Sequence, residues 1–245
     1  MNLRIITYNI HKGFSLSNLA YTLDLIKAGL QKTGADIVCL QEVCGRQSHF
    51  SNSRLSNLEK QFEYLADGHW KEHSYGKNAA YSTGDHGNAI LSQFPIESFD
   101  NSDLSLHRYE QRGLLHCKLK ISQSQTLHVF TTHLNLLARD RKIQTEKVID
   151  QIHSKVPESE PVIFCGDFND WTQELSAPLI KRLHFSEAFQ ITQGKLAESF
   201  PSYFPILPLD RVYFRGLRAI KTETLRDRSW SKLSDHLPLL VDFEL

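Results

Sequence analysis

The sequence lacks any long apolar run, any surplus of one charge and any N-terminal leader pattern. No apolar stretch approaches the ~20 residues that a membrane-spanning helix needs. Lysine and arginine number 28, as do aspartate and glutamate, so no global field draws the chain to nucleic acid, although a local patch could. The chain enters a strand-like run directly after Met1, without the basic segment and apolar stretch of a leader. These absences predict a cytoplasmic protein with no transmembrane segment.

Cysteines are also few, and their positions argue against a zinc site. Three of the four, Cys39, Cys117 and Cys165, lie within apolar, strand-like runs, where a thiol behaves as a small hydrophobe. Cys44 follows Cys39 closely, but no second close pair completes a set of zinc ligands. We therefore expect the cysteines to be core residues.

What is present suits a globular enzyme. The 245 residues are 40% hydrophobic and 23% charged, which allows an ordered core in one large domain or two small ones. Strand-like runs are mixed with about four segments of helical spacing. This mixture predicts an α/β or α+β fold, with two packed sheets as one arrangement.

The first predicted unit is a strand, a helix and a second strand. Residues 3–10 form the first strand, with Asn9 at its end, and residues 36–41 form the second, followed by Glu42. If the strands are parallel neighbours, Asn9 and Glu42 lie close together. Apolar residues recur at helical spacing between the strands, and Ser15 or Ser17 could cap the helix and Gly34 end it. These apolar residues are Leu16, Leu19, Leu23, Ile26 and Leu30.

The stretch from Pro161 to Asp170 carries the strongest local signal. Val162 to Cys165 are apolar and predict a strand buried on both faces, which Gly166 ends. Asp167 and Asn169 follow at i and i+2, and in an extended chain their side chains point the same way. The alternative is a simple turn with solvated side chains, since these residue types are common in turns.

Other predicted strands also end or begin at residues that can bind a cation or carry a proton. His133 follows residues 127–132, Asp210 opens a strand over residues 210–214, and Asp235 and His236 precede the last strand. Singly, each has an ordinary explanation as a turn, cap or core residue. Together they recur at strand ends, and carboxylate and amide oxygens suit Mg²⁺ or Mn²⁺ better than zinc.

Two further features leave alternatives open. Seven basic residues lie between Arg211 and Lys232, either as a solvated face or as a site for a phosphate-rich ligand. Trp171, Phe204 and Trp230 lie near the polar strand ends in sequence. They could stack on a base, face a lipid or simply pack against the rest of the protein.

These stretches together resemble the endonuclease/exonuclease/phosphatase superfamily, which includes DNase I-like nucleases, neutral sphingomyelinases and inositol polyphosphate 5-phosphatases. They follow the order of the family and span nearly the whole chain. The resemblance implies a single catalytic domain over residues 1–245, folded as a four-layer α/β/β/α sandwich of two mixed sheets. The matching stretches are Thr7-Tyr-Asn-Ile-His11, Leu40-Gln-Glu-Val43, Gly87-Asn-Ala-Ile-Leu-Ser92, Thr132-His-Leu134, Gly166-Asp-Phe-Asn169, Leu209-Asp-Arg-Val212 and Ser234-Asp-His-Leu-Pro238.

The resemblance also implies a role for each matching residue. Glu42 would be the main Mg²⁺ ligand, with Asn9 and Asp235 as further ligands and Mn²⁺ as a possible substitute. Asp167 would activate the attacking water. Asn169 and His236 would hold phosphate oxygens, with Asp210 orienting His236. His133 would contact the phosphate or protonate the leaving oxygen, and Arg112 resembles an arginine that reaches the phosphate.

The implied activity is Mg²⁺-dependent hydrolysis of a phosphate ester, with a phosphodiester ranked first. The substrate could be a small molecule, a lipid head group or a nucleic acid, and no protein partner is implied. The alternatives are a nuclease, a phosphomonoesterase and a binding module that kept the fold without catalysis.

Overall fold

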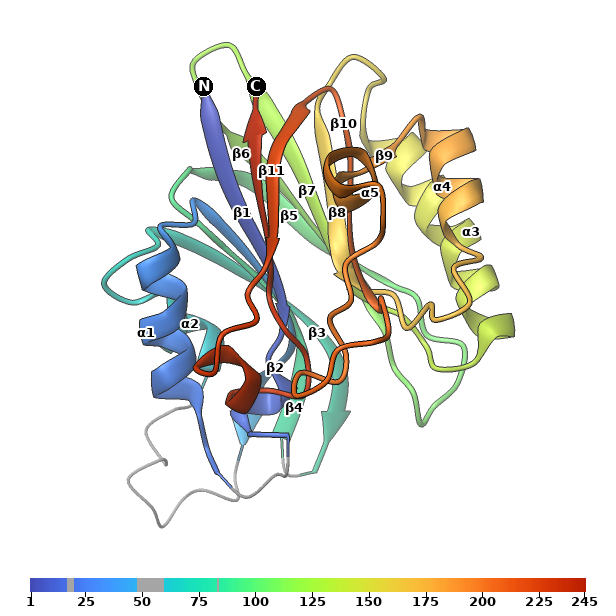
Figure 1. Ribbon diagram of the computed structural model, residues 1–245. Coiled ribbons are helices and arrows are strands. Elements are labelled where there is room, and N and C mark those ends of the chain that lie inside the picture. The colour runs from blue at the N-terminus through green and yellow to red at the C-terminus, as the bar shows by residue number, and fades with distance from the viewer. Residues whose placement is uncertain (17–19, 48–59, 83) are drawn as a thin grey trace.

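The computed structural model describes residues 1–16, 20–47, 60–82 and 84–245. Its strands form two six-stranded sheets that pack face to face, and most of the helices cover their outer faces (Figure 1). Each sheet contains parallel and antiparallel pairs. The predicted sandwich of two mixed sheets is therefore confirmed.

The first sheet has the strand order β11-β12-β1-β2-β4-β3. Its outer face is covered by two helices and by a short 3-10 helix, and a second 3-10 helix follows β1. The strands are β1 (Asn2–Asn9), β2 (Ile37–Gln47), β3 (Glu72–Tyr81), β4 (Gly84–Ser92), β11 (Arg218–Thr224) and β12 (Leu239–Glu244), and the helices are η1 (His11–Gly13), α1 (Leu23–Thr33), α2 (Gln61–Ala66) and η3 (Trp230–Lys232).

The second sheet has the strand order β5-β6-β7-β8-β10-β9. Helices α3 and α4 pack on its outer face, and α5 contacts β10 and β11 at the edge where the sheets meet. The elements are β5 (Ile96–Asp103), β6 (Gly113–Lys120), β7 (Thr126–His133), α3 (Ala138–Lys155), β8 (Val162–Asp167), α4 (Ser176–Leu183), β9 (Ser186–Glu187), α5 (Ala188–Gln193) and β10 (Asp210–Arg215).

The first helix begins later than its apolar spacing predicts. It starts at Leu23 rather than near Ser15, and Leu16 lies in an exposed turn. The segment before it is fixed by tertiary contacts, because the Thr22 hydroxyl donates to the Leu233 carbonyl at 2.6 Å. The predicted end is correct, since Gly34 takes the left-handed conformation with φ of 65°.

The basic segment from Arg211 to Lys232 does not form one face. Arg211 is fully buried and donates to the Asp170 carbonyl at 3.2 Å, whereas Arg218 and Lys221 lie on the exposed strand β11, which sequence periodicity did not reveal. The spacing of Leu55, Leu58, Phe62 and Leu65 also predicts a second helix. The structure shows a helix from Gln61, and Leu55 and Leu58 lie outside the described residues.

The layer between the sheets explains where the polar strand ends meet. Along β8, Ile163 and Cys165 point into the apolar core between the sheets, and alternation brings Asp167 to the same side. The same change from apolar to polar side chains occurs on neighbouring strands. Leu3 and Ile5 lead to Asn9 on β1, Leu127 and Val129 lead to His133 on β7, and Phe214 and Val212 lead back to Asp210 on β10.

The cysteines lie in the core, as their apolar sequence neighbours predict. Cys39, Cys117 and Cys165 lie in the core between the sheets, and all four cysteines are buried and outside any disulfide bond. Among the described residues, no helix combines the length and the apolar character needed to cross a membrane.

Candidate active site

A polar layer separates the apolar core from the site above it. The Gln41 amide nitrogen donates to the Thr7 hydroxyl at 3.1 Å and to the Thr131 hydroxyl at 2.9 Å. All three residues are at most 1% exposed. Since Thr131 belongs to the second sheet, the bond between Gln41 and Thr131 connects the two sheets directly beneath the site.

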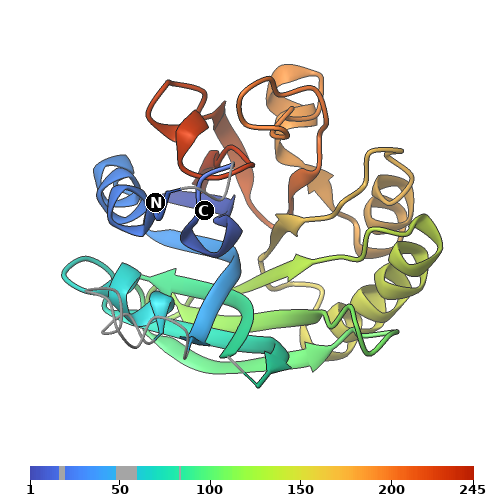
Figure 2. The ribbon, with the colours of Figure 1, turned by 90° about the horizontal axis from the view of Figure 1, so that it is seen from below.

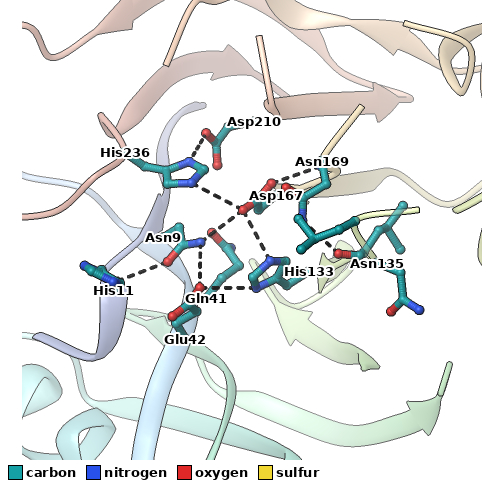
Figure 3. Close-up of polar contacts among 12 residues, drawn as sticks. Asn9, His11, Gln41, Glu42, His133, Asn135, Asp167, Asn169, Asp210 and His236 are labelled. Carbon is teal, nitrogen blue, oxygen red and sulfur yellow. Dashed lines mark hydrogen bonds and ion pairs between the residues drawn. The ribbon is translucent and has the colours of Figure 1, made fainter. Parts of the chain in front are cut away.

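Asp167 lies at the centre of the site. Its Oδ2 atom accepts a hydrogen bond from the Asn9 amide at 3.0 Å, and it lies 3.4 Å from His133 Nε2 and 3.5 Å from His236 Nε2 (Figure 3). Asp167 is 1% exposed, and burial raises its pKa despite the neighbouring His236. The structure thus brings four of the predicted residues together from four separate segments.

Glu42 reaches the site through an irregular backbone. Strict alternation along β2 would point it away from Gln41, but the β2–β4 register shifts here and Glu42 has a φ of 56°. Its Oε1 atom consequently lies 3.5 Å from the Asn9 amide nitrogen, as the parallel pairing of β1 and β2 predicted. Burial is the largest single influence on the pKa of Glu42 and opposes its ionisation. Lys12, with Nζ 3.5 Å from Oε2, outweighs burial only together with His11, His236 and the Asn9 hydrogen bond, and the pKa of Glu42 is lowered as a result.

Asp235 approaches from the loop before β12. The Ser234 hydroxyl donates to the Asn9 backbone carbonyl at 2.7 Å and lies 3.2 Å from Asp235 Oδ1. That same oxygen lies 3.9 Å from His11 Nδ1, and the His11 backbone N–H donates to Asn9 Oδ1 at 3.1 Å. Asp235 is therefore held next to Asn9, with its side chain partly open to solvent.

His236 is paired with Asp210 through one ring nitrogen. His236 Nδ1 lies 2.7 Å from Asp210 Oδ2, which also accepts a hydrogen bond from the Ser199 hydroxyl at 2.5 Å. Burial opposes the charged form of His236, but Asp210 and Asp167 outweigh burial and raise the pKa of His236. Nε2 is left facing Asp167 and the centre of the site.

His133 is buried and close to both halves of the site. Its Nδ1 atom lies 3.9 Å from Glu42 Oε1, in addition to the contact of Nε2 with Asp167. Burial, together with the positive charge of Arg112, lowers the pKa of His133 well below its usual range. Arg112 itself donates to Glu110 at 3.1 Å, so its guanidinium is near the site but engaged by a carboxylate.

Asn169 follows β8 through a tight turn rather than an extended chain. Its φ is 49°, its backbone N–H donates to Asp167 Oδ1 at 3.0 Å, and its side-chain amide donates to the Leu134 carbonyl at 2.9 Å. The extended chain that would point the side chains of Asp167 and Asn169 the same way is therefore not formed, and it is the Asn169 backbone that contacts Asp167. Strained backbone at two site residues, Glu42 and Asn169, is typical of functional positions.

Asp170 is a turn residue, as one interpretation of the sequence had it, but a buried one. Its carboxylate accepts hydrogen bonds from the backbone N–H groups of Glu174 and Leu175, at 3.2 and 3.0 Å, and it is 1% exposed. It therefore stabilises the loop that leads to α4 rather than the site itself.

Several supporting residues could not be singled out from the sequence. Ser199 bonds to Asp210, which is 11 residues away, and Glu110 accepts from Arg112, which is two residues away. Neither Ser199 nor Glu110 lies in a recognisable sequence pattern. Gln41 was part of a matching stretch, but its contact with Thr131 spans 90 residues. Asn135 is fully buried and bonds to Gln144 and Asp140, which fixes the loop after His133.

The site concentrates oxygen donors that suit a hard cation. Glu42, Asn9 and Asp235 surround one side of it. A second group, Asp167, Asp210 and His236, has ligand atoms within 4.8 Å of one another. In that group the Asp210–His236 hydrogen bond already pairs one ligand atom of each residue.

Comparisons with known proteins agree with this geometry. The sequence profile described as the endonuclease/exonuclease/phosphatase family matches residues 6–236. The relative YbhP from Escherichia coli (strain K12) is 38% identical over 244 residues, which cover 99% of this chain and 96% of the relative.

Solved structures show the same fold. An endonuclease/exonuclease/phosphatase from Bacteroides vulgatus superposes with a TM-score of 0.77 at 18% identity, covering 100% of this chain and 99% of the other. A mannosyl-6-phosphatase from Bacteroides thetaiotaomicron superposes with a TM-score of 0.76 at 16% identity, covering 99% and 100%. With the profile match across nearly all of its length, the chain belongs to the endonuclease/exonuclease/phosphatase family, whose members act on phosphate esters.

Proposed function

We propose that the protein is a Mg²⁺-dependent phosphodiesterase that uses water activated by Asp167. The observation that carries this proposal is the position of Asp167 Oδ2, within 3.5 Å of Asn9, His133 and His236 at the buried end of the layer between the sheets. In-line attack on a phosphate ester requires positioning and charge neutralisation more than covalent catalysis.

The residues that would hold Mg²⁺, or Mn²⁺ in its place, are Glu42, Asn9 and Asp235. Their carboxylate and amide oxygens fit a hard cation, and Lys12, with Nζ 3.5 Å from Glu42 Oε2, offsets part of their negative charge. A bound ion would supply charge stabilisation to the phosphoryl oxygens. The group of Asp167, Asp210 and His236 is less suitable, because the hydrogen bond between Asp210 and His236 already occupies one ligand atom of each.

Asp167 is suited to act as the base. Burial raises its pKa, which makes the carboxylate a stronger proton acceptor than an exposed aspartate. The Asn9 amide and the Asn169 backbone N–H donate to its two oxygens and fix its orientation. A water beside Oδ2 would lose its proton to this carboxylate as it attacks phosphorus.

The two histidines would contact the phosphate in different ways. His236, held in its charged form by Asp210, would donate from Nε2 to a non-bridging phosphate oxygen, and Asn169 would hold another phosphate oxygen. His133 has a strongly lowered pKa and is neutral at neutral pH. This favours a hydrogen bond from His133 to the phosphate over delivery of a proton to the leaving oxygen.

The arrangement of Arg112 favours a diester over a monoester. A monoester dianion carries one more negative charge than a diester, and Arg112 is the arginine that the family resemblance places at the phosphate. Its guanidinium instead donates to Glu110, which already offsets its charge. The residues left to face the phosphate suit the single charge of a diester.

The test is hydrolysis of bis(p-nitrophenyl) phosphate and of p-nitrophenyl phosphate, with Mg²⁺, with Mn²⁺ and with EDTA. We expect metal-dependent turnover that favours the diester. Glu42→Ala and Asp167→Asn should each lower kcat by about 10²–10⁴-fold. Calorimetric titration with Mn²⁺ should separate their roles, because Glu42→Ala loses metal binding whereas Asp167→Asn retains it.

Asp150→Asn is the matched control, since Asp150 is an exposed carboxylate on the outer helix α3. It should hydrolyse the diester as the unmodified protein does. Turnover that persists in EDTA, or a Glu42→Ala protein with full activity, would contradict the proposed site. A preference for the monoester would contradict the choice of substrate class while leaving the metal site intact.

A further inference from the structure

Large apolar side chains are exposed on the loops that surround the candidate site. We call these residues the apolar rim, and they are 44% to 83% exposed. Each lies on a loop that carries or follows a site residue, and these loops emerge at the lower end of the molecule in Figure 1, onto which Figure 2 looks. The rim consists of Tyr109, Leu136, Leu137, Trp171, Tyr203, Phe204 and Ile206.

One part of the rim is tied to the His236 side of the site. The loop from Ser199 to Leu209 places the Phe200 ring 4.9 Å from the His236 ring. The Ser202 backbone N–H donates to the Asp235 carbonyl at 2.7 Å, and the Ser202 hydroxyl bonds back to the Ser234 carbonyl. Ser202 is 2% exposed, yet Tyr203, next to it, is 82% exposed. The loop is therefore fixed at its base and apolar at its tip.

The other part of the rim lies beside His133 and Asn169. Leu136 and Leu137 follow His133, and the Leu136 backbone N–H donates to Glu110 at 3.0 Å. The guanidinium of Arg141 lies 4.4 Å from the centre of the Trp171 ring, so one face of the indole is covered while 44% of the residue stays exposed. The rim thus borders the site from both sides rather than from one loop.

The residue types in the rim decide what it can bind. Leu136, Leu137 and Ile206 have no π-face, so they offer no stacking surface to a nucleobase. Aromatic and aliphatic side chains around a polar site are typical of the membrane interface, where the apolar groups enter the acyl region. Two exposed arginines lie beside the rim residues, Arg108 on the loop of Tyr109 and Arg139 in the first turn of α3, and neither has an ion-pair partner within the described part of the chain.

We propose that the apolar rim seats the protein on a bilayer that contains anionic phospholipid. Rim side chains would enter the head-group boundary, Arg108 and Arg139 would face anionic head groups, and the site would open toward the phosphates of the lipid. This inference rests on the proposed function for its substrate, a phospholipid phosphodiester, but the membrane contact itself does not depend on catalysis.

The binding test uses the Asp167→Asn protein and sedimentation with sucrose-loaded vesicles of phosphatidylcholine, with and without phosphatidylglycerol. We expect binding that is strongest with phosphatidylglycerol. The double variant Tyr203→Ser with Phe204→Ser should weaken binding by at least about tenfold, because two aromatic side chains lose their apolar burial. Arg108→Gln and Arg139→Gln should each weaken binding about fivefold, and only on the vesicles that contain phosphatidylglycerol.

Tryptophan fluorescence gives an independent readout. Trp70 and Trp230 are buried, at 4% and 5% exposure, whereas Trp171 is exposed on the rim. A blue shift on addition of vesicles would therefore report Trp171 entering an apolar environment. The Trp171→Phe protein should show no such shift while still sedimenting with the vesicles.

The matched control is Phe99→Ser with Ile191→Ser, two exposed apolar residues on β5 and α5 away from the rim. It should bind vesicles as Asp167→Asn alone does. The proposal would be overturned if the protein did not bind vesicles, or if the rim and control variants lost vesicle binding equally. Binding of the rim to a protein instead of vesicles would also overturn it. Hydrolysis of the soluble diester, measured in parallel, decides the proposed function separately.

Discussion

The Gln41 amide and the Thr131 hydroxyl form a hydrogen bond of 2.9 Å that joins the two sheets beneath the site. Asn9 and Glu42 come from the first sheet, and His133 and Asp167 come from the second. The site can therefore hold its geometry only if the sheets keep their relative position. The bond between Gln41 and Thr131 lies in the buried layer next to the site, where it can hold the two sheets in that relative position.

Replacing Gln41 with leucine should destabilise the protein by about 1–3 kcal/mol, because the buried hydroxyls of Thr7 and Thr131 lose their donor. Urea unfolding monitored by circular dichroism measures this loss. Thr131→Val is the control, since it removes one acceptor and leaves the Gln41 amide bonded to Thr7. If the two residues act through their mutual bond, the double variant should lose less stability than the sum of the single variants. Strict additivity would contradict the link.

Gly166 should not tolerate a side chain. A Cβ atom at this position would lie 2.0 Å from the Thr132 backbone carbonyl oxygen, and the φ of Gly166 is +141°. Gly166→Ala should therefore lower the free energy of unfolding by more than about 3 kcal/mol, or prevent folding.

Gly194 provides the matched control for this substitution. It also has a positive φ, of +73°, but no atom lies within 4 Å of an added Cβ. Gly194→Ala should cost only about 1 kcal/mol, from backbone strain alone. Equal losses in the two variants, measured by thermal unfolding, would show that the close approach to Thr132 does not govern the result.

Asp210 should keep His236 in its charged form and should be needed for fast hydrolysis of the diester. Asp210→Asn removes the anion that lies 2.7 Å from His236 Nδ1, so the charged imidazolium becomes less favourable and the pKa of His236 falls. We expect kcat on the diester to drop by about 10²–10⁴-fold. A histidine titration followed by NMR checks the pKa directly.

Ser199→Ala separates charge from hydrogen bonding at the same position. It removes the hydroxyl that donates to Asp210 Oδ2 but leaves the carboxylate in place. The pKa of His236 should therefore change less than in Asp210→Asn. An unchanged titration of His236 in Asp210→Asn would rule out the proposed pairing.

The sequence predicts which residues lie at the site better than it predicts the contacts that hold them in place. Alternation along a strand is local, so Asp167 and His133 could be assigned to strand ends from their neighbours alone. The bulge that turns Glu42 toward the site depends on the pairing of β2 with β4, which no local pattern reveals. The start of α1 at Leu23 likewise depends on a contact with Leu233. Contacts across such distances arise only when the sheets assemble.

A pair of buried histidines away from the site should make stability depend on pH. His116 Nε2 lies 2.9 Å from His128 Nδ1, and the outer nitrogens face Asp100 and Glu160. Burial lowers the pKa of His116 to about 4, even though Asp100 opposes this effect. His128 also has a lowered pKa, chiefly from burial.

The direction of the pH effect follows from proton binding. An unfolded histidine has a pKa of about 6.5, so between about pH 6.5 and 4 the His116 side chain binds more protons in the unfolded chain than in the folded one. Stability contributed by the buried neutral histidine is therefore complete above this window and is lost as the pH falls through it. His116→Gln should flatten the decline by about 1–3 kcal/mol across the window, as measured by urea unfolding at a series of pH values. His153→Gln, at an exposed position on α3, should leave the decline unchanged, and a His116→Gln protein with the slope of the unmodified protein would contradict the assignment.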